Sequence, residues 1–253
     1  RDQPRSRGLG DVYKRQALAI SIGEKARVDL PYMEQLTGKT QAELVKDLHG
    51  VIFKVPNSEP VSYAATDEYL SGNVRTKLLI AQAVAKDDPE LAVNVEALKQ
   101  VIPKNLSAAE ISVRLGTTWI PQEDIQQFVV ELLTPSQYAR GKIKVRYTEF
   151  NGDWFIENKS SDFDNVKANS TYGTKRASAY RIIEDTLNLR DVRIFDYVYD
   201  EHGNKKAVFN AKETTAAQAK QEAIKQAFAD WIWKDPERRN RLVRYYNDTF
   251  NCI

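Results

Sequence analysis

The sequence has few of the residues from which metal and catalytic sites are built. Its 253 residues include one cysteine, Cys252, and two histidines, His49 and His202. A single thiol can form neither an internal disulfide nor a thiolate zinc cluster. Neither histidine accompanies the signature of a serine or cysteine nucleophile, and the common zinc motifs are missing. The sequence therefore predicts no metal site and no catalytic residue.

A phosphate-binding loop is also missing, although Gly38-Lys39-Thr40 matches the end of one. In the pattern G-x-x-x-x-G-K-[ST] the first glycine would fall on position 33, which is Met33 here. The preceding segment has a helical pattern, whereas that motif follows a buried strand. We interpret Gly38 as a helix stop and Thr40 as a helix N-cap, so no cofactor-binding residue is predicted.

Long hydrophobic runs are missing as well. No window approaches the run of about eighteen apolar residues that a membrane-spanning helix needs, and the N-terminus lacks the apolar segment of a secretory signal. With 42% hydrophobic and 28% charged residues, the composition is that of a globular protein. We therefore expect a cytoplasmic location and no membrane partner.

Residues 1–16, RDQPRSRGLGDVYKRQ, have neither a helical nor a strand period. They resemble a peptide that arises when sequencing-adaptor DNA is translated at the broken end of a gene. We expect this segment to be non-native and unfolded; a genuine basic arm that binds nucleic acid is the alternative. It has five basic and two acidic residues, so the total charge of +2 leaves −1 for the other residues. Net charge therefore gives no argument for a nucleic-acid partner.

Residues 17–65 begin with signals for three short helices. An apolar run at 17–23 comes first, and Asp29 is a candidate N-cap for the second helix. Thr40 and Glu43 have the spacing of a capping box and predict the start of the third.

Two strand-like runs, 51–55 and 61–65, follow these helices around a turn with two prolines. Three helices and a hairpin are the element order of a winged helix. Residues 41–48 would then be the recognition helix and 56–60 the wing tip. The alternative is a small helical bundle with a hairpin that binds nothing or binds protein.

The remaining chain predicts two further parts. Residues 66–141 are expected to be a helical connector, helical throughout as far as residue 134. Residues 142–253 are expected to be an α+β unit ending in two helices, with a hairpin at Asn151-Gly152 and a second strand pair at 193–199 and 207–210. The whole chain is predicted to be α+β and mainly helical.

Eleven residues are candidates for DNA contacts. Three lysines lie in or beside the predicted recognition helix and wing, and two basic clusters lie later in the chain. Basic residues with aromatic neighbours suit phosphate tracking and base stacking. The alternative is that the later arginines only solvate the outer face of a helix. The candidates are Lys39, Gln41, Lys46, Lys54, Lys175, Arg176, Arg181, Arg238, Arg239, Arg241 and Arg244.

Four stretches together carry a family resemblance: ATDEYLSGNVRTKL (65–78), EISVRLGTTWIPQEDI (110–125), STYGTKRASAYRIIEDTLNLRDV (170–192) and RNRLVRYYNDTFNCI (239–253). They resemble the segment that precedes the ATPase motor in very large Snf-type superfamily-two helicases of bacterial mobile elements and phages. Many of those proteins also carry an adenine-specific DNA methylase on the N-terminal side. The resemblance extends over residues 17–253.

The resemblance implies a context but transfers no catalytic residue, because the sequence lacks the phosphate loop and D-E-x-H of the motor and the N-P-P-Y of the methylase. ATP hydrolysis with Mg²⁺, and any methyl transfer, would belong to the parent protein, and both ends are expected to be truncated. The implied partners are DNA and the missing motor and methylase modules. We expect a non-catalytic accessory region that binds DNA or docks on the motor; a purely structural connector or adaptor is the alternative.

Overall fold

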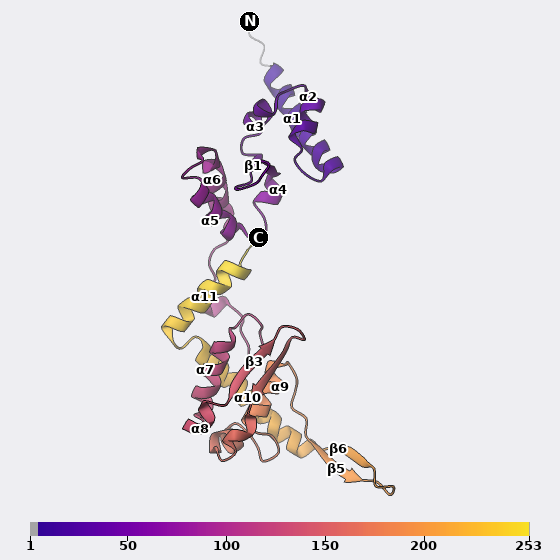
Figure 1. The fold of residues 1–253 in the computed structure, drawn as a ribbon, viewed down its shortest axis with the longest axis vertical. Helices are drawn as coiled ribbons and strands as arrows, with labels where there is room; N and C mark the ends of the chain where they lie inside the picture. Colours follow the sequence, from indigo (N-terminus) through magenta and orange to yellow (C-terminus); the bar gives the residue numbers. More distant parts are fainter. Residues whose placement is uncertain (1–4, 253) are drawn as a thin grey trace. The chain divides into compact units, whose positions relative to one another are not determined.

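Helices dominate the structure, and each sheet in the described part of the chain has two strands (Figure 1). The computed structural model describes residues 5–252. The predicted class, α+β and mainly helical, is confirmed. The chain divides into two units, which we call unit 1 (Arg1–Leu106 with Tyr245–Ile253) and unit 2 (Ser107–Arg244).

The second and third helices of unit 1 begin at the predicted caps. Asp29 accepts a hydrogen bond from the Tyr32 backbone N–H at 3.0 Å. This helix ends at Gly38, whose φ of 69° lies in the left-handed region that glycine tolerates. Thr40 and Glu43 form the predicted capping box. The first three helices are α1 (Arg5–Lys25), α2 (Leu30–Thr37) and α3 (Gln41–Asp47).

The first helix begins earlier than predicted. Residues 5–16 lie in α1, so the expectation that residues 1–16 are unfolded is wrong there, and residues 1–4 lie outside the described part. Lys14 Nζ lies 2.6 Å from Asp47 Oδ2 in α3, and the Tyr13 hydroxyl donates to the Leu36 carbonyl in α2. These tertiary contacts stabilise a segment of weak helix propensity. Its adaptor origin stays a prediction.

The predicted hairpin consists of β1 (Ile52–Lys54) and β2 (Tyr63–Ala65), paired antiparallel. Phe53 of β1 is buried and stacks on Tyr69, with ring centroids 5.2 Å apart. The same core includes Val74 and Leu98, so the expected boundary between residues 65 and 66 falls inside one core. The elements that follow the hairpin are α4 (Thr66–Tyr69), α5 (Val74–Val84), the 3-10 turn η1 (Pro89–Leu91) and α6 (Ala92–Val101).

Residues 102–121 do not form the helices expected for this stretch. They contain one 3-10 turn, η2 (Ala108–Glu110). Proline at positions 103 and 121 removes backbone N–H donors, and Gly116 has a φ of 105°, which no helix contains. The next helices are α7 (Gln122–Leu133) and the short α8 (Gln137–Arg140).

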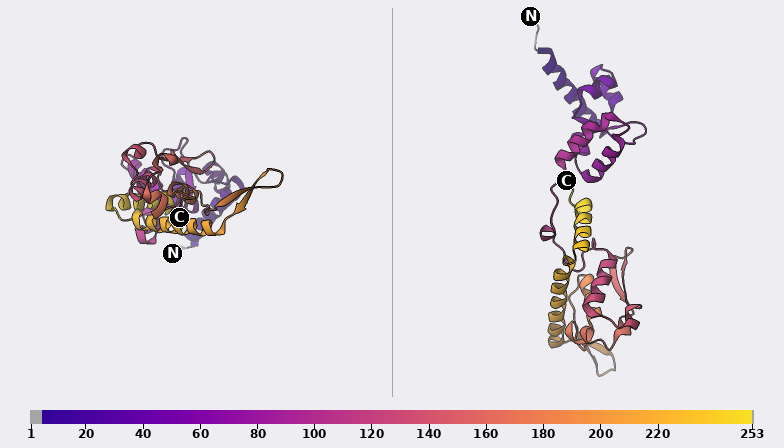
Figure 2. Two further views of the ribbon diagram at one scale, coloured as in Figure 1. Left: turned by 90° about the horizontal axis from the view of Figure 1, so that it is seen from below. Right: turned by 90° about the vertical axis from the view of Figure 1, so that its left-hand side faces the viewer.

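The core of unit 2 forms where a β-hairpin packs among helices (Figure 2). The hairpin predicted from Asn151-Gly152 is confirmed, and Thr148 lies opposite Asp153 across its turn. Phe128 and Phe228 meet edge to face in this core, with centroids 5.1 Å apart. The elements are β3 (Lys144–Thr148), β4 (Asp153–Glu157), the 3-10 turn η3 (Lys159–Asp162), the π-helical turn η4 (Lys167–Thr171) and α9 (Ala179–Leu187).

The C-terminal elements also follow the prediction. The second strand pair is present, and two helices end the chain. Leu242 of the last helix lies in the core of unit 2. Further along the same helix, Asn247 bonds both backbone groups of Leu106 in unit 1, accepting from its N–H at 2.7 Å and donating to its C=O at 2.9 Å. The elements are β5 (Phe195–Tyr199), β6 (Lys205–Phe209), α10 (Ala211–Ile232) and α11 (Pro236–Phe250).

Candidate nucleic-acid interface

One face of α3 is polar and exposed because its apolar side chains pack inward. Leu44 and Leu48 are buried in the core formed with α1 and α2. Gln41 and Lys46 are exposed. The Gln41 side-chain amide donates to Glu34 in α2 at 3.3 Å, whereas Lys46 makes no ion pair with any residue that the structure describes. The ammonium group of Lys46 is therefore available to bind an anionic partner.

Lys39 lies immediately before α3 and shares a carboxylate with Lys14. Its Nζ is 3.2 Å from Asp47 Oδ2, and its side chain is 40% exposed. The hydrogen bond from Lys14, and after it the one from Lys39, hold the pKa of Asp47 below its usual range. The structure thus brings the candidates Lys39, Gln41 and Lys46 together at α3, with the charge of Lys39 partly neutralised.

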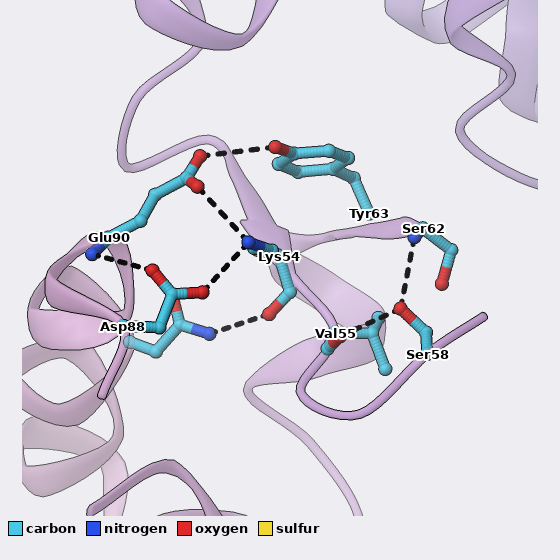
Figure 3. Close-up of polar contacts among 8 residues, drawn as sticks. Lys54, Val55, Ser58, Ser62, Tyr63, Asp88 and Glu90 are labelled. Carbon is cyan, nitrogen blue, oxygen red and sulfur yellow. Dashed lines mark hydrogen bonds and ion pairs between the residues drawn. The ribbon is translucent and has the colours of Figure 1, made fainter. Parts of the chain in front are cut away.

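Lys54, the fourth candidate in unit 1, is held by two carboxylates (Figure 3). Its Nζ lies 2.7 Å from Asp88 Oδ2 and 3.3 Å from Glu90 Oε2. The Tyr63 hydroxyl donates to the other Glu90 oxygen at 3.1 Å, and the Asn94 amide donates to the Lys54 carbonyl at 2.8 Å. Hydrogen bonding to Asp88 raises the pKa of Lys54. This lysine joins the turn end of β1 to η1 and α6, so its charge is not free for a phosphate.

The predicted wing tip, 56–60, is closed by a serine. The Ser58 hydroxyl donates to the Val55 carbonyl at 2.8 Å and accepts from the Ser62 backbone N–H at 3.0 Å (Figure 3). No basic residue lies in this turn. The wing is therefore ordered but offers a phosphate no cation at its tip.

The cluster Lys175, Arg176 and Arg181 lies in unit 2, at the base of the β5–β6 hairpin. Arg176 Nη1 lies 2.7 Å from Asp196 Oδ1, and its Nη2 donates to the Phe195 carbonyl at 2.9 Å. Arg181 Nη2 donates to the Arg193 carbonyl at 3.1 Å. Lys175 is exposed. Arg176 and Arg181 thus fix the hairpin to the start of α9.

Two arginines of α11 bind the end of α10. Arg238 is 6% exposed, its Nε donates to the Ile232 carbonyl at 3.1 Å, and its guanidinium lies 3.5 Å from the centroid of the Trp231 ring. Arg239 Nη1 donates to the Trp233 carbonyl at 3.4 Å. These carbonyls are among those that a helix C-terminus leaves unpaired, so both arginines stabilise the fold.

Arg241 forms a forked ion pair with Asp124 of α7. Its Nη1 donates to Oδ2 at 3.1 Å and its Nη2 to Oδ1, and the carboxylate is 5% exposed. Arg244 is exposed. The structure therefore does not gather the arginines after Pro236 into one exposed patch.

Sequence reasoning overlooked one exposed surface, the β5–β6 hairpin. Tyr197 is 60% exposed and Tyr199 is 72% exposed. The signal that could have found it is the alternation of aromatic residues at 195, 197 and 199, inside the segment 193–199 that was predicted as a strand. In the described part of the chain, no three His, Cys, Asp or Glu residues are grouped to hold a metal. None of the described helices has the length and hydrophobicity to span a membrane.

Two family models match the chain. Residues 15–63 match the model described as "Probable helicase, winged helix domain", which covers the second half of α1 and all of α2, α3 and β1. The N-terminal part is therefore a helicase-associated winged helix. Residues 114–252, more than half of the chain, match "Domain of unknown function (DUF8437)".

The chain belongs to the DUF8437 family. The DUF8437 region runs from before α7 to the end of α11 and includes the β5–β6 hairpin. No curated protein and no solved structure matches the chain significantly.

Proposed function

We propose that this chain is a non-catalytic accessory region of a DNA helicase, whose winged helix contacts duplex DNA through Lys39, Gln41 and Lys46. The observation that carries the proposal is the helicase winged-helix match at residues 15–63, together with the exposed polar face of α3. In a winged helix the third helix enters the major groove, and cations beside it bind phosphates.

The proposal leaves out the candidates whose release would leave a partner group unpaired; Lys39 is kept because Asp47 is also paired with Lys14. Lys54 is bound by two carboxylates, Arg238 is buried, and Arg241 neutralises a buried aspartate. Moving such a cation to a phosphate would leave its partner unpaired, which opposes binding.

The wider context belongs to the same proposal. ATP and Mg²⁺ would be bound by a motor in the parent protein, and the parent would act on DNA in the cytoplasm of a bacterium or on the DNA of a phage or mobile element. The proposed parent protein would also carry a methylase module on its N-terminal side. The chain itself would lead DNA to the motor or dock against it.

The test is the salt dependence of duplex binding by the full chain, measured by fluorescence anisotropy. Each phosphate contact contributes about 0.9 to the slope of log K against log salt concentration. Lys46→Ala should lower affinity on every duplex sequence and reduce the slope by about 1. Lys99→Ala, which removes an exposed lysine of α6, is the matched control and should leave the slope unchanged. Equal losses in both variants, or no binding by the wild-type chain, would contradict the proposal.

A structural connector is the second candidate, and the engaged arginines favour it. Arg176, Arg238 and Arg241 all bond groups within unit 2. If this candidate is right, the same titration shows no duplex binding at any salt concentration, and adding a separately produced motor gives a stable complex instead.

A further inference from the structure

One face of the β5–β6 hairpin carries four aromatic side chains. Side chains alternate between the two faces of a strand, so Phe195, Tyr197 and Tyr199 lie on the same face. The residues opposite them on β6 are Phe209, Ala207 and Lys205. We propose that this face binds single-stranded DNA by stacking unpaired bases on its rings. The proposal does not depend on α3 or on duplex binding.

No part of unit 2 covers this face. Nine of the ten strand residues are exposed, and the strands pair only with each other. Figures 1 and 2 show the hairpin extending away from α9 and α10. An isolated two-stranded ribbon is marginally stable in water, and contiguous exposed apolar surface marks an interaction site. The stabilising contacts of the ribbon are local: Phe195 meets Phe209 edge to face, and Lys205 Nζ lies 4.2 Å from the Tyr197 ring centroid.

The charges on the hairpin suit a polyanion that approaches the aromatic face. This face includes Lys205, whereas Asp196 belongs to the opposite face by alternation and Asp200 follows β5 at the turn. Asp196 is paired with Arg176, and Asp200 accepts the backbone N–H groups of the turn. The remaining acid among residues 193–210, all of which the structure describes, is Glu201 in the turn.

Exposed cations lie near the base of the ribbon. Arg181 bonds the carbonyl of Arg193, which is itself exposed, and Lys175 is exposed beside Arg176. Phosphates next to the stacked bases would therefore meet positive charge at the base and, through Lys205, near the tip. A basic groove with aromatic platforms is the arrangement by which proteins hold single strands without reading their sequence.

The spacing of the rings favours a single strand over a duplex. Rings two residues apart on a strand are separated by about 6.6 Å along the strand. Bases stacked in B-DNA are separated by about 3.4 Å along each strand. Successive bases can therefore lie on successive rings only if they are unstacked and splayed apart, as in single-stranded DNA.

The test uses the full chain and a fluorescently labelled oligothymidylate, which forms no duplex. We expect Tyr197→Ala and Tyr199→Ala each to weaken binding about 5- to 100-fold, the range given by the loss of one stacked base. Tyr197→Phe keeps the ring and should bind like the wild type. Val198→Ala is the matched control, because Val198 lies on the opposite face and is 47% exposed. Unchanged thermal unfolding would show that the variants fold.

The outcome also separates this proposal from the one for α3. Lys46→Ala should leave oligothymidylate binding unchanged while it weakens duplex binding. The hairpin proposal is overturned if the wild-type chain does not bind oligothymidylate, or if Val198→Ala weakens binding as much as Tyr199→Ala. It is also overturned if the tyrosine variants change only the self-association of the chain in sedimentation, since the aromatic face would then bind protein.

Discussion

Gly173 lies at a position with no room for a side chain. A Cβ at this residue would lie 2.0 Å from the Ala168 carbonyl oxygen and 2.8 Å from the Ala179 backbone nitrogen. Both atoms belong to backbone at the edge of the unit 2 core, so neither can move away without shifting η4 or the start of α9.

We therefore predict that Gly173→Ala destabilises unit 2 by roughly 1–3 kcal/mol in urea unfolding, as overpacking does. Gly141→Ala is the control, because a Cβ there would have nothing within 4 Å and the residue has a right-handed φ of −72°. That change should be neutral or stabilise by up to about 1 kcal/mol. Equal effects of the two substitutions would contradict the steric argument.

Arg241 was predicted to contact DNA, but in the structure it pairs with Asp124. Arg241→Ala would leave the Asp124 carboxylate, which is 5% exposed, without its forked partner. We predict a loss of about 1–3 kcal/mol in the free energy of unfolding. Arg241→Lys keeps the charge but not the fork and should lose less. If instead Arg241→Ala unfolds like the wild type and only weakens DNA binding, the arginine is a DNA contact.

Among the elements, the hairpin of the winged helix is attached to its neighbours by ion pairs of Lys54 with Asp88 and Glu90. The hydrogen bond from Lys54 holds the pKa of Asp88 below its usual range. A carboxyl whose pKa is lower in the folded than in the unfolded state stabilises the folded state. This stabilisation is complete at pH values above the unfolded pKa, which is about 3.9 for aspartate. It is lost as the pH falls through the lower pKa of the folded state. Thr40 and Lys14 lower the pKa values of Glu43 and Asp47 in the same direction.

We thus predict that the melting temperature of unit 1 falls as pH drops below about 4. Asp88→Asn should melt at a lower temperature than the wild type at pH 7, and the difference should shrink with acidification because the wild-type pair is then also lost. Circular dichroism melts between pH 2 and 7 measure this. A constant difference down to pH 2 would contradict the assignment to the Lys54–Asp88 pair.

At the scale of the whole molecule, unit 1 and unit 2 have separate hydrophobic cores. The core of unit 2 is one cluster between residues 115 and 242, and unit 1 has two clusters between residues 17 and 102. None of the described core residues belongs to clusters in both units.

This separation predicts two unfolding transitions in calorimetry rather than one. Gly173→Ala should lower the transition of unit 2 alone. Leu98→Ala creates a cavity at a fully buried position in unit 1. It should destabilise unit 1 by about 2–5 kcal/mol and lower the melting temperature of that unit alone. A single transition that both substitutions shift equally would show that the units unfold cooperatively.

The sequence alone was enough where short-range rules act. The Asp29 cap, the Thr40–Glu43 capping box and the Asn151-Gly152 hairpin were predicted because each involves residues within a few positions of one another. The order of three helices and a hairpin followed from these signals, and the winged-helix match agrees with it.

Tertiary structure decided which basic residues remain available and how far the folded chain extends. Lys54 meets Asp88 34 positions away, and Arg241 meets Asp124 117 positions away. Residues 5–16 are helical in a structure where Lys14 contacts α3. No local pattern contains such pairings, because the free energy of an ion pair depends on burial and distance in the folded chain. For the same reason, the sequence predicted a strand at 193–199, but only the fold left its aromatic face uncovered.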